Sequence, residues 1–321
     1  MSARESDVAV GLVGVGTIAA THLLVLSELP EVSLQFVVDP DPATSVSFRT
    51  ARPPHYHALG DAFGDHQPDL VVITAPTPTH AELTYEALAG STARVLVEKP
   101  LVDDPDALSL LRSRVGGLDP RTRVSVAHHF AFSPEVRWSA DQLARHPGWG
   151  PVTRITSCFH DPYIADAERS FAAYTSSWID SGVNQLSMLA RFVDLVERGP
   201  LHECDGGASA WCSVVFAAGS DALAGSALLR TSWQAIASSK RTTVELGHSG
   251  VEVWLDHTAV TAFVAQDGRV VDALVNDGLT PRKIAHYRPL YQSLLSDTPD
   301  PILSFDTACT VVDLLHGRAS A

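Results

Sequence analysis

The sequence predicts an α/β protein of two domains, a doubly wound parallel sheet followed by an α/β domain on an open, mostly antiparallel sheet. Three observations predict it. Short apolar strands alternate with helical patterns over residues 1–125, which favours parallel strands connected by helices. A glycine turn links the first strand to the first helix. Residues 126–321 hold short alternating runs between turn residues, typical of an antiparallel sheet with one covered face.

The first strand and helix carry the pattern of a dinucleotide site. An apolar strand over residues 8–13 runs into Gly14-Val15-Gly16-Thr17-Ile18-Ala19, where a helical pattern begins. Gly14 permits the tight turn, Gly16 lets the backbone approach a pyrophosphate, and Ala19 still allows close packing of helix on strand. The N-terminus of the helix then offers free N–H groups and a partial positive charge to the phosphates.

The second strand predicts which dinucleotide is bound. It covers residues 34–38 and ends on Asp39, and no arginine follows directly. A carboxylate at this place accepts hydrogen bonds from the ribose hydroxyls and repels a 2′-phosphate. We therefore expect NAD as the cofactor, and NADP is disfavoured.

Later strands of the first domain add candidate residues. The chain has apolar strands over residues 69–74 and 94–97. Ligands of a doubly wound sheet bind beyond the carboxyl ends of its strands. We therefore expect one crevice to gather the residues at these ends: Gly14, Asp39, Thr74, Ala75, Pro76, Glu98 and Lys99.

Three helix starts in this domain are predicted from capping residues. Asp, Ser and Thr favour the position before a helix, Pro favours its first position, and Glu three residues after Thr completes a capping box. These patterns occur at Asp41-Pro42, at Thr79 with Glu82, and at Asp104-Pro105.

Lys99 is the strongest candidate for chemistry. The chain has three lysines and twenty arginines, so arginine is used wherever a plain positive charge suffices. Arginine keeps its proton in proteins, whereas a partly buried lysine can exchange one with a substrate. The alternative is that Lys99 only pairs with its neighbour Glu98.

Composition excludes several classes of protein. The net charge of −14 disfavours nucleic acid and anionic membranes as partners. No apolar run reaches 18 residues and the first residues lack an apolar signal core, so we expect a cytoplasmic protein. The four cysteines show no CxxC spacing, which predicts neither a disulfide framework nor a metal site.

The second domain is predicted in less detail. Apolar residues at helical spacing over residues 183–198 predict an amphipathic helix. Alternating runs then predict antiparallel strands at residues 211–216, 222–229, 242–246, 251–255 and 260–264.

Together these motifs resemble the glucose-fructose oxidoreductase / inositol dehydrogenase (Gfo/Idh/MocA) family. The matching segments follow the family's order: the glycine turn, Val38-Asp39-Pro40-Asp41, Thr74-Ala75-Pro76-Thr77-Pro78-Thr79-His80, Glu98-Lys99-Pro100-Leu101 and Asp180-Ser181-Gly182-Val183. The resemblance implies an N-terminal Rossmann domain (residues 1–125) and a C-terminal domain (126–321) that binds substrate and forms a homodimer or homotetramer. It also implies hydride transfer at a CH–OH centre of a polyol, ketose or sugar derivative.

The resemblance also implies the site residues. Lys99, Asp180 and Asn184 occupy the catalytic positions. The cofactor positions are Gly14, Gly16, Thr17, Ile18, Asp39, Thr74, Ala75, Pro76, Thr79, His80, Glu98 and Lys99. No metal is expected.

One position departs from the family pattern. Asn184 stands where the family usually has its catalytic histidine, and Ser187 stands where it usually has an aspartate three residues later. An amide cannot take up a proton near neutral pH, so proton transfer falls to Lys99, aided by Asp180, or to a group outside the pattern: His160, Asp161, Tyr163 or Tyr174.

This departure leaves four functions open. The leading one is an NAD-dependent dehydrogenase or ketoreductase (EC 1.1.1.-), with Asn184 orienting substrate and Asp180 modulating Lys99. The others are a catalytically idle dinucleotide-binding regulator, an imine reductase, and a lyase or hydrolase that returns NAD unreduced. The titratable Lys99 argues against the idle regulator, because a binding module needs no such group.

Overall fold

The computed structural model describes residues 7–41, 43–44, 46–217, 224–247 and 250–318. The chain divides into two compact units. The first comprises Met1–Ala127 together with Tyr287–Val312, and the second comprises His128–His286 with Asp313–Ala321. Residues 287–312 therefore pack with the N-terminal sheet although they come late in the sequence.

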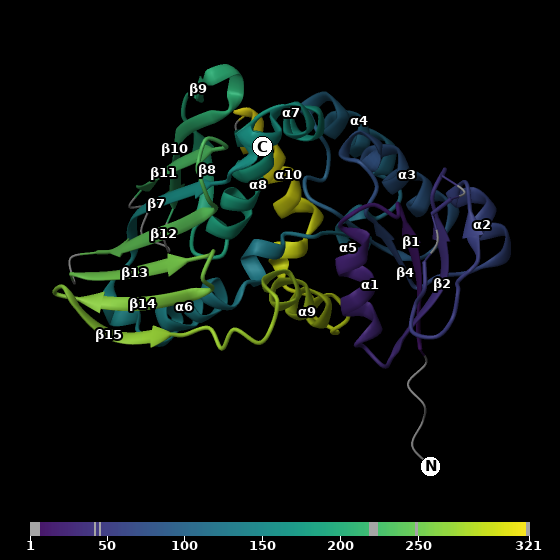
Figure 1. Ribbon diagram of the computed structural model, residues 1–321, viewed down its shortest axis with the longest axis horizontal. Coiled ribbons are helices and arrows are strands. Elements are labelled where there is room, and N and C mark those ends of the chain that lie inside the picture. The colour runs from purple at the N-terminus through teal and green to yellow at the C-terminus, as the bar shows by residue number, and fades with distance from the viewer. Residues whose placement is uncertain (1–6, 42, 45, 218–223, 248–249, 319–321) are drawn as a thin grey trace, which may run out of the picture. The chain divides into compact units, whose positions relative to one another are not determined.

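The first unit is built on a six-stranded parallel sheet. Its strands lie in the order β3-β2-β1-β4-β5-β6, and every pairing is parallel. This order confirms the predicted doubly wound sheet. The strands are β1 (Val8–Val13), β2 (Val32–Val38), β3 (His55–Tyr56), β4 (Leu70–Ile73), β5 (Arg94–Val97) and β6 (Val124–Val126) (Figure 1).

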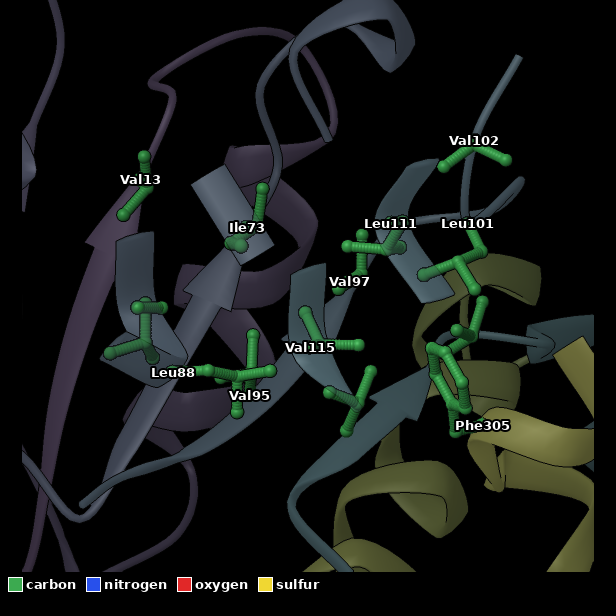
Figure 2. Packing of buried hydrophobic residues seen from close by; sticks show 14 of the residues in the cluster. Val13, Ile73, Leu88, Val95, Val97, Leu101, Val102, Leu111, Val115 and Phe305 are labelled. Atoms are coloured by element: carbon green, nitrogen blue, oxygen red, sulfur yellow. The ribbon is translucent and has the colours of Figure 1, made fainter. Parts of the chain in front are cut away.

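The helices of this unit bury the apolar faces of the sheet. Figure 2 shows side chains of β4 and β5, such as Ile73, Val95 and Val97, packed among Leu88, Leu111 and other apolar residues. Because both faces are covered, β4 is buried along its whole length, as expected for a central parallel strand. The helices are α1 (Ala19–Ser27), α2 (Leu59–Asp65), α3 (His80–Gly90), α4 (Pro105–Val115) and α5 (Pro120–Arg123), together with the parts of α9 (Arg282–Leu294) and α10 (Phe305–His316) that fall within residues 287–312.

One of the three predicted helix caps forms. The Asp104 side chain accepts hydrogen bonds from two backbone N–H groups at the start of α4. At the predicted start Asp41-Pro42, Pro42 lies outside the described residues; the Asp41 carboxylate accepts the Ala43 N–H, and the described residues from 43 to 54 form no helix. The helix start predicted at Thr79 is confirmed, because α3 begins at His80 with Thr79 as the residue before it, but the capping box is wrong because the Thr79 side chain makes no capping hydrogen bond. A 3₁₀ turn (Thr77–Thr79) precedes α3, and the Thr79 hydroxyl donates to the Pro76 carbonyl.

The second unit is built on a nine-stranded sheet, which confirms the predicted mostly antiparallel class. The strand order is β15-β14-β13-β12-β7-β11-β10-β8, with β9 paired to β10. Within this second sheet, β7 and β11 form the only parallel pair among the described strands. The strands are β7 (Val152–His160), β8 (Asp194–Arg198), β9 (His202–Cys204), β10 (Ser209–Ala217), β11 (Ala224–Ser232), β12 (Ser239–Leu246), β13 (Val251–Asp256), β14 (Thr261–Gln266) and β15 (Arg269–Leu274).

Helices cover one face of this sheet. The helix α8 (Ser177–Leu189) packs on β10 and β11, and α6 (Pro134–Arg145) packs on β13 and β14; α7 (Ala167–Tyr174) precedes α8. Side chains of β10 and β12 alternate between buried and more exposed, so one face of the sheet stays open. The helix predicted over residues 183–198 is too long: it ends at Leu189, and β8 pairs with β10 instead.

No helix within the described ranges is long and apolar enough to span a membrane.

Within the second unit, a buried cluster of histidines joins α6 to the end of β13 and to the first residues of α9. Glu135 accepts a hydrogen bond from His257 Nδ1 (2.7 Å), and the two δ-nitrogens of His129 and His286 lie 3.1 Å apart. Burial lowers the pKa of His286 from 6.5 to about 4, which the nearby Glu135 carboxylate only partly offsets. His286 is therefore neutral in the folded protein at neutral pH.

This depressed pKa predicts a loss of stability in mild acid. Below pH 6.5 the unfolded chain protonates His286, whereas the folded chain does so only near pH 4. The free energy of unfolding should therefore fall between these values, by about 2 kcal/mol at pH 5 from this residue. Urea unfolding at pH 7.5 and 5 should show a smaller loss for His286→Gln than for the wild type. Equal losses in both proteins would refute the assignment.

Candidate active site

The glycine turn follows β1 and is shaped by a close approach of two loops. Gly14 has a φ of +87°, a conformation that strains residues with a side chain. A Cβ atom added there would lie 2.5 Å from the Cα and N atoms of Ala75. The Thr74 hydroxyl donates to the Gly14 carbonyl oxygen (2.5 Å). Only glycine therefore fits at the first position of the turn.

Open space lies at the second glycine. An added Cβ on Gly16 would meet no atom within 4 Å, and the residue is exposed at the start of α1. Asp39, at the end of β2, accepts the backbone N–H of Val15 through Oδ2 (2.7 Å) and that of Asp41 through Oδ1 (2.9 Å). The acid is thus fixed against the glycine turn. A tight first glycine, an open second glycine and a fixed acid fit a dinucleotide.

The remaining cofactor candidates differ in exposure. Thr17, Pro76 and Thr79 are exposed, and Ile18 is half-buried. His80 is buried, and its two ring nitrogens lie 2.8 Å from the carbonyl oxygens of Pro100 and Ala75. His80 therefore joins the loop after β4 to the loop after β5.

Glu98 is the buried centre of the loop after β5. Its Oε1 atom accepts hydrogen bonds from His22 Nε2 (2.8 Å) and the Tyr287 hydroxyl (2.5 Å). Its Oε2 atom accepts the backbone N–H of Lys99 (3.1 Å). His22 Nδ1 in turn lies 2.6 Å from the Tyr291 hydroxyl. These contacts join α1, β5 and α9 within the first unit.

The charge of Glu98 follows from these donors. Burial by itself raises the pKa of a carboxyl group, but the hydrogen bonds from His22 and Tyr287 outweigh it and hold the pKa of Glu98 below its ordinary value. Glu98 is therefore a carboxylate near neutral pH. The adjacent Lys99 is half-buried at the carboxyl end of β5, the edge of the sheet that also carries the glycine turn.

The other two catalytic candidates lie in the second unit, on α8. Asp180 and Asn184 are both buried, one helical turn apart. The Asn184 side-chain nitrogen donates to the Asp180 carbonyl oxygen (3.2 Å). The Asn184 amide therefore keeps its oxygen and one N–H for another partner, and neither of these groups titrates.

The second unit also contains an ion pair that sequence reasoning missed in part. Lys240 Nζ lies 2.5 Å from both carboxylate oxygens of Asp161, and both side chains are buried. Asp161 was considered from the sequence, but Lys240 was not. The available signal was its rarity, as one of three lysines in the chain.

Metal sites are absent from the described part of the chain. No group of three His, Cys, Asp or Glu side chains is placed to hold a metal ion there. All four cysteines are free thiols.

The role of Glu98 predicts a large effect on stability. Glu98→Leu leaves the His22 and Tyr287 donors buried without their acceptor and should destabilise the first unit by about 3–5 kcal/mol. Glu82 is the matched control, because its ion pair with Arg114 is largely exposed. Glu82→Leu should change stability by about 1 kcal/mol or less. Denaturant unfolding of both variants measures the difference, and equal effects would rule out an anchoring role for Glu98.

This chain resembles known proteins in part of its sequence and in its fold. Residues 8–113 match the model of an oxidoreductase family with an NAD-binding Rossmann fold, GFO_IDH_MocA. The comparison with curated protein sequences finds no match.

Solved structures share the fold over nearly the whole chain. An NAD-binding oxidoreductase from Klebsiella pneumoniae is 17% identical with a TM-score of 0.78, covering 98% of this chain and 96% of its own. UDP-N-acetylglucosamine 3-dehydrogenase from Acidithiobacillus ferrooxidans is 16% identical (TM-score 0.72; 96% and 95%). A levoglucosan dehydrogenase in complex with NADH is 14% identical (TM-score 0.77; 96% and 95%). The matched segment contains the glycine turn and the Glu98-Lys99-Pro100 motif, so residues 8–113 are similar to the NAD-binding Rossmann part of this oxidoreductase family.

Proposed function

We propose that this oxidoreductase transfers hydride between NAD and a CH–OH or carbonyl carbon of a sugar, cyclitol or sugar derivative. The observation that carries the proposal is the placement of Lys99. A partly buried amine follows a β-strand at the same sheet edge as the glycine turn, next to a carboxylate fixed by buried donors. Two structural neighbours are named as dehydrogenases of sugar compounds, which supports the substrate class.

In this proposal, different residues bind the cofactor, transfer the proton and orient the substrate. Gly14, Gly16 and Asp39 hold the dinucleotide, which supplies or accepts the hydride. The Lys99 ammonium donates a proton to the reacting oxygen during reduction, and the neutral amine takes that proton back during oxidation. Asp180 modulates this exchange, and the free oxygen and N–H of the Asn184 amide orient the substrate.

A second candidate function is a dinucleotide-binding regulator without turnover. Asn184 favours it, because an amide replaces the expected imidazole. NADH binding without nicotinamide absorbance change across a panel of polyols and ketoses would support the regulator. A lyase or hydrolase that uses NAD transiently also gives no net change in absorbance, but it consumes substrate and is distinguished in that way. An imine reductase is tested by adding an amine to the panel.

A homodimer or homotetramer in the cytoplasm completes the proposal. The open face of the second sheet carries the exposed side chains of Trp211 and Trp254, and exposed aromatic side chains favour protein contacts. Sedimentation of the purified chain measures the assembly.

Loss of the Lys99 amine should slow the chemistry and spare the cofactor. Lys99→Met is expected to lower kcat by about 10²–10⁴, the usual contribution of general acid–base catalysis, while the Kd for NADH stays unchanged. Lys283 is exposed, and Lys283→Met serves as the control with unchanged kcat. Stopped-flow absorbance of NADH measures the step. Full activity of Lys99→Met would remove this residue from the mechanism.

Asp39 should set the choice of cofactor. Asp39→Ala removes the acceptor for the ribose hydroxyls and the repulsion of a 2′-phosphate, so binding of NADH should weaken and binding of NADPH should strengthen. Calorimetric titration of both cofactors measures the ratio of the two Kd values. The interpretation fails if the wild-type protein already binds NADPH more tightly than NADH.

A further inference from the structure

Five buried side chains of the second unit form a continuous chain of hydrogen bonds from α6 to α8, here called the Glu135–Gln185 chain. Glu135 Oε1 on α6 lies 2.7 Å from His257 Nδ1, and His257 Nε2 lies 2.9 Å from the Thr242 hydroxyl. The Thr242 hydroxyl lies 2.9 Å from that of Ser157, which accepts the side-chain N–H of Gln185 on α8 (3.0 Å). Thr242 and Ser157 are directly opposite each other on β12 and β7. The chain therefore crosses the covered face of the sheet from one helix to the other.

The two ends of this chain fix the direction of its hydrogen bonds. Burial by itself raises the pKa of Glu135, but its neighbours, His257 foremost, outweigh burial and hold this pKa below its ordinary value. The group is therefore a carboxylate, which only accepts. At the other end, the Gln185 side-chain nitrogen also lies 3.2 Å from the Arg230 carbonyl oxygen. Because a carbonyl oxygen only accepts, the Gln185 amide turns its nitrogen, and not its oxygen, to Arg230 and Ser157.

The protons of the middle groups follow from these ends. The Glu135 carboxylate requires a proton on His257 Nδ1. The Ser157 oxygen receives the Gln185 N–H, so the Ser157 hydroxyl donates to Thr242, and the Thr242 hydroxyl donates to His257 Nε2. Met188 Sδ lies 3.9 Å from the Thr242 oxygen and is only a weak acceptor. His257 thus carries its proton on Nδ1 and accepts at Nε2.

Stability alone is a weak explanation for this arrangement. Gln185 Oε1 is buried and has no hydrogen-bond partner among the described residues, which costs free energy that an apolar side chain would not. Hydrophobic contacts are non-directional, whereas a hydrogen bond requires a narrow range of distances and angles. Gln185 makes two hydrogen bonds from the face of α8 that is turned to the sheet. These bonds restrict rotation of α8 about its axis, which apolar packing alone restricts less.

We propose that the Glu135–Gln185 chain, with its hydrogen bonds running from Gln185 to Glu135, positions α8 for the reaction. It holds the helix in the one rotation that points Asp180 and Asn184 to the substrate, since Gln185 directly follows Asn184. The members of the chain are positioning residues, because they act through α8 and not on the reacting atoms. The inference rests on the proposed function for the roles of Asp180 and Asn184, but the chain itself can be tested without turnover.

The first test locates the proton of His257 in the wild-type protein. Ring ¹⁵N chemical shifts should show a protonated Nδ1 and an unprotonated Nε2 at neutral pH. The signals are assigned through contacts of this imidazole with the Phe159 ring, whose centroid lies 5.3 Å away. A proton on Nε2 would reverse the donor at Thr242 and would overturn the proposal.

The second test removes one hydroxyl from the chain. Thr242→Val has the shape of threonine without the hydroxyl, and Thr242→Ser keeps the hydroxyl. Hydrogen–deuterium exchange of α8 amides should be about tenfold faster in Thr242→Val, as for loss of a buried hydrogen bond, while β14 exchanges as in the wild type. Thr242→Ser should restore the slow exchange. The control is Thr243→Val, because burial alternates along β12 and Thr243 belongs to the open face.

Turnover separates this inference from the proposed function. With NAD and either myo-inositol or D-glucose, kcat/KM should fall by about 10–10²-fold in Thr242→Val, as for a misplaced reacting group. It should recover in Thr242→Ser, and the Kd for NADH should stay unchanged in both variants. Absence of hydride transfer by the wild type counts against the proposed function and not against the chain, which the first two measurements then decide.

Two results with folded Thr242→Val overturn the positioning role while the proposed function stands. One is unchanged exchange of α8 together with unchanged kcat/KM. The other is equally faster exchange throughout the second unit, β14 included, which indicates a merely structural role. If Thr242→Val does not fold, Ser157→Ala breaks the same chain at the next hydroxyl and is measured with the same expected results.

Discussion

The first unit depends on the buried carboxylate of Glu98. Three donors from separate segments, His22 on α1, Tyr287 on α9 and the Lys99 backbone, converge on its two oxygens. Removing a charge from water costs several kcal/mol, and only a nearly complete set of hydrogen bonds offsets that cost. The carboxylate therefore requires the first helix, the fifth strand and a segment from near the C-terminus to assemble together. The same contacts fix the backbone position of Lys99, because it is the next residue in the chain and its N–H donates to Glu98.

The same edge of the sheet shows how backbone constraints and chemistry are combined. Gly14 is required because the loop after β4 approaches within 2.5 Å of where its Cβ would lie. His80 then joins that loop to the one after β5 through the carbonyl oxygens of Ala75 and Pro100. The turn for the dinucleotide and the strand end that carries the amine are thus connected by hydrogen bonds through a buried imidazole. A rigid support of this kind is what placement of a reacting group demands.

The sequence predicted the parallel sheet and its glycine turn because their signals are local: apolar runs, a turn that only glycine adopts, and an acid at a strand end. It could not show that Tyr287 reaches Glu98, since such contacts depend on the path of the whole chain. Local signals also failed where two structures compete. Residues 194–198 continue the helical spacing of α8, yet they pair with β10 as a strand. Thr79 has a capping partner in sequence, but the preceding 3₁₀ turn redirects its hydroxyl. Apart from the rarity of lysine, the sequence gave no sign of the Lys240–Asp161 pair, because the two residues are 79 positions apart.

The few lysines of this chain stand in environments unlike those of its arginines. Arginine provides nearly all of the fixed positive charge in this chain. In ion pairs such as Arg114–Glu82 and Arg288–Glu28, a permanent charge is sufficient. Of the three lysines, Lys240 is instead buried and Lys99 is half-buried. A lysine in that environment differs from arginine in two respects: its proton can leave, and its compact ammonium group directs three donors to different acceptors. The first property suits the role of Lys99 in the proposed function, where its amine exchanges a proton with the reacting oxygen. The second property accounts for the buried pair with Asp161, because both carboxylate oxygens accept hydrogen bonds from the one Lys240 ammonium group.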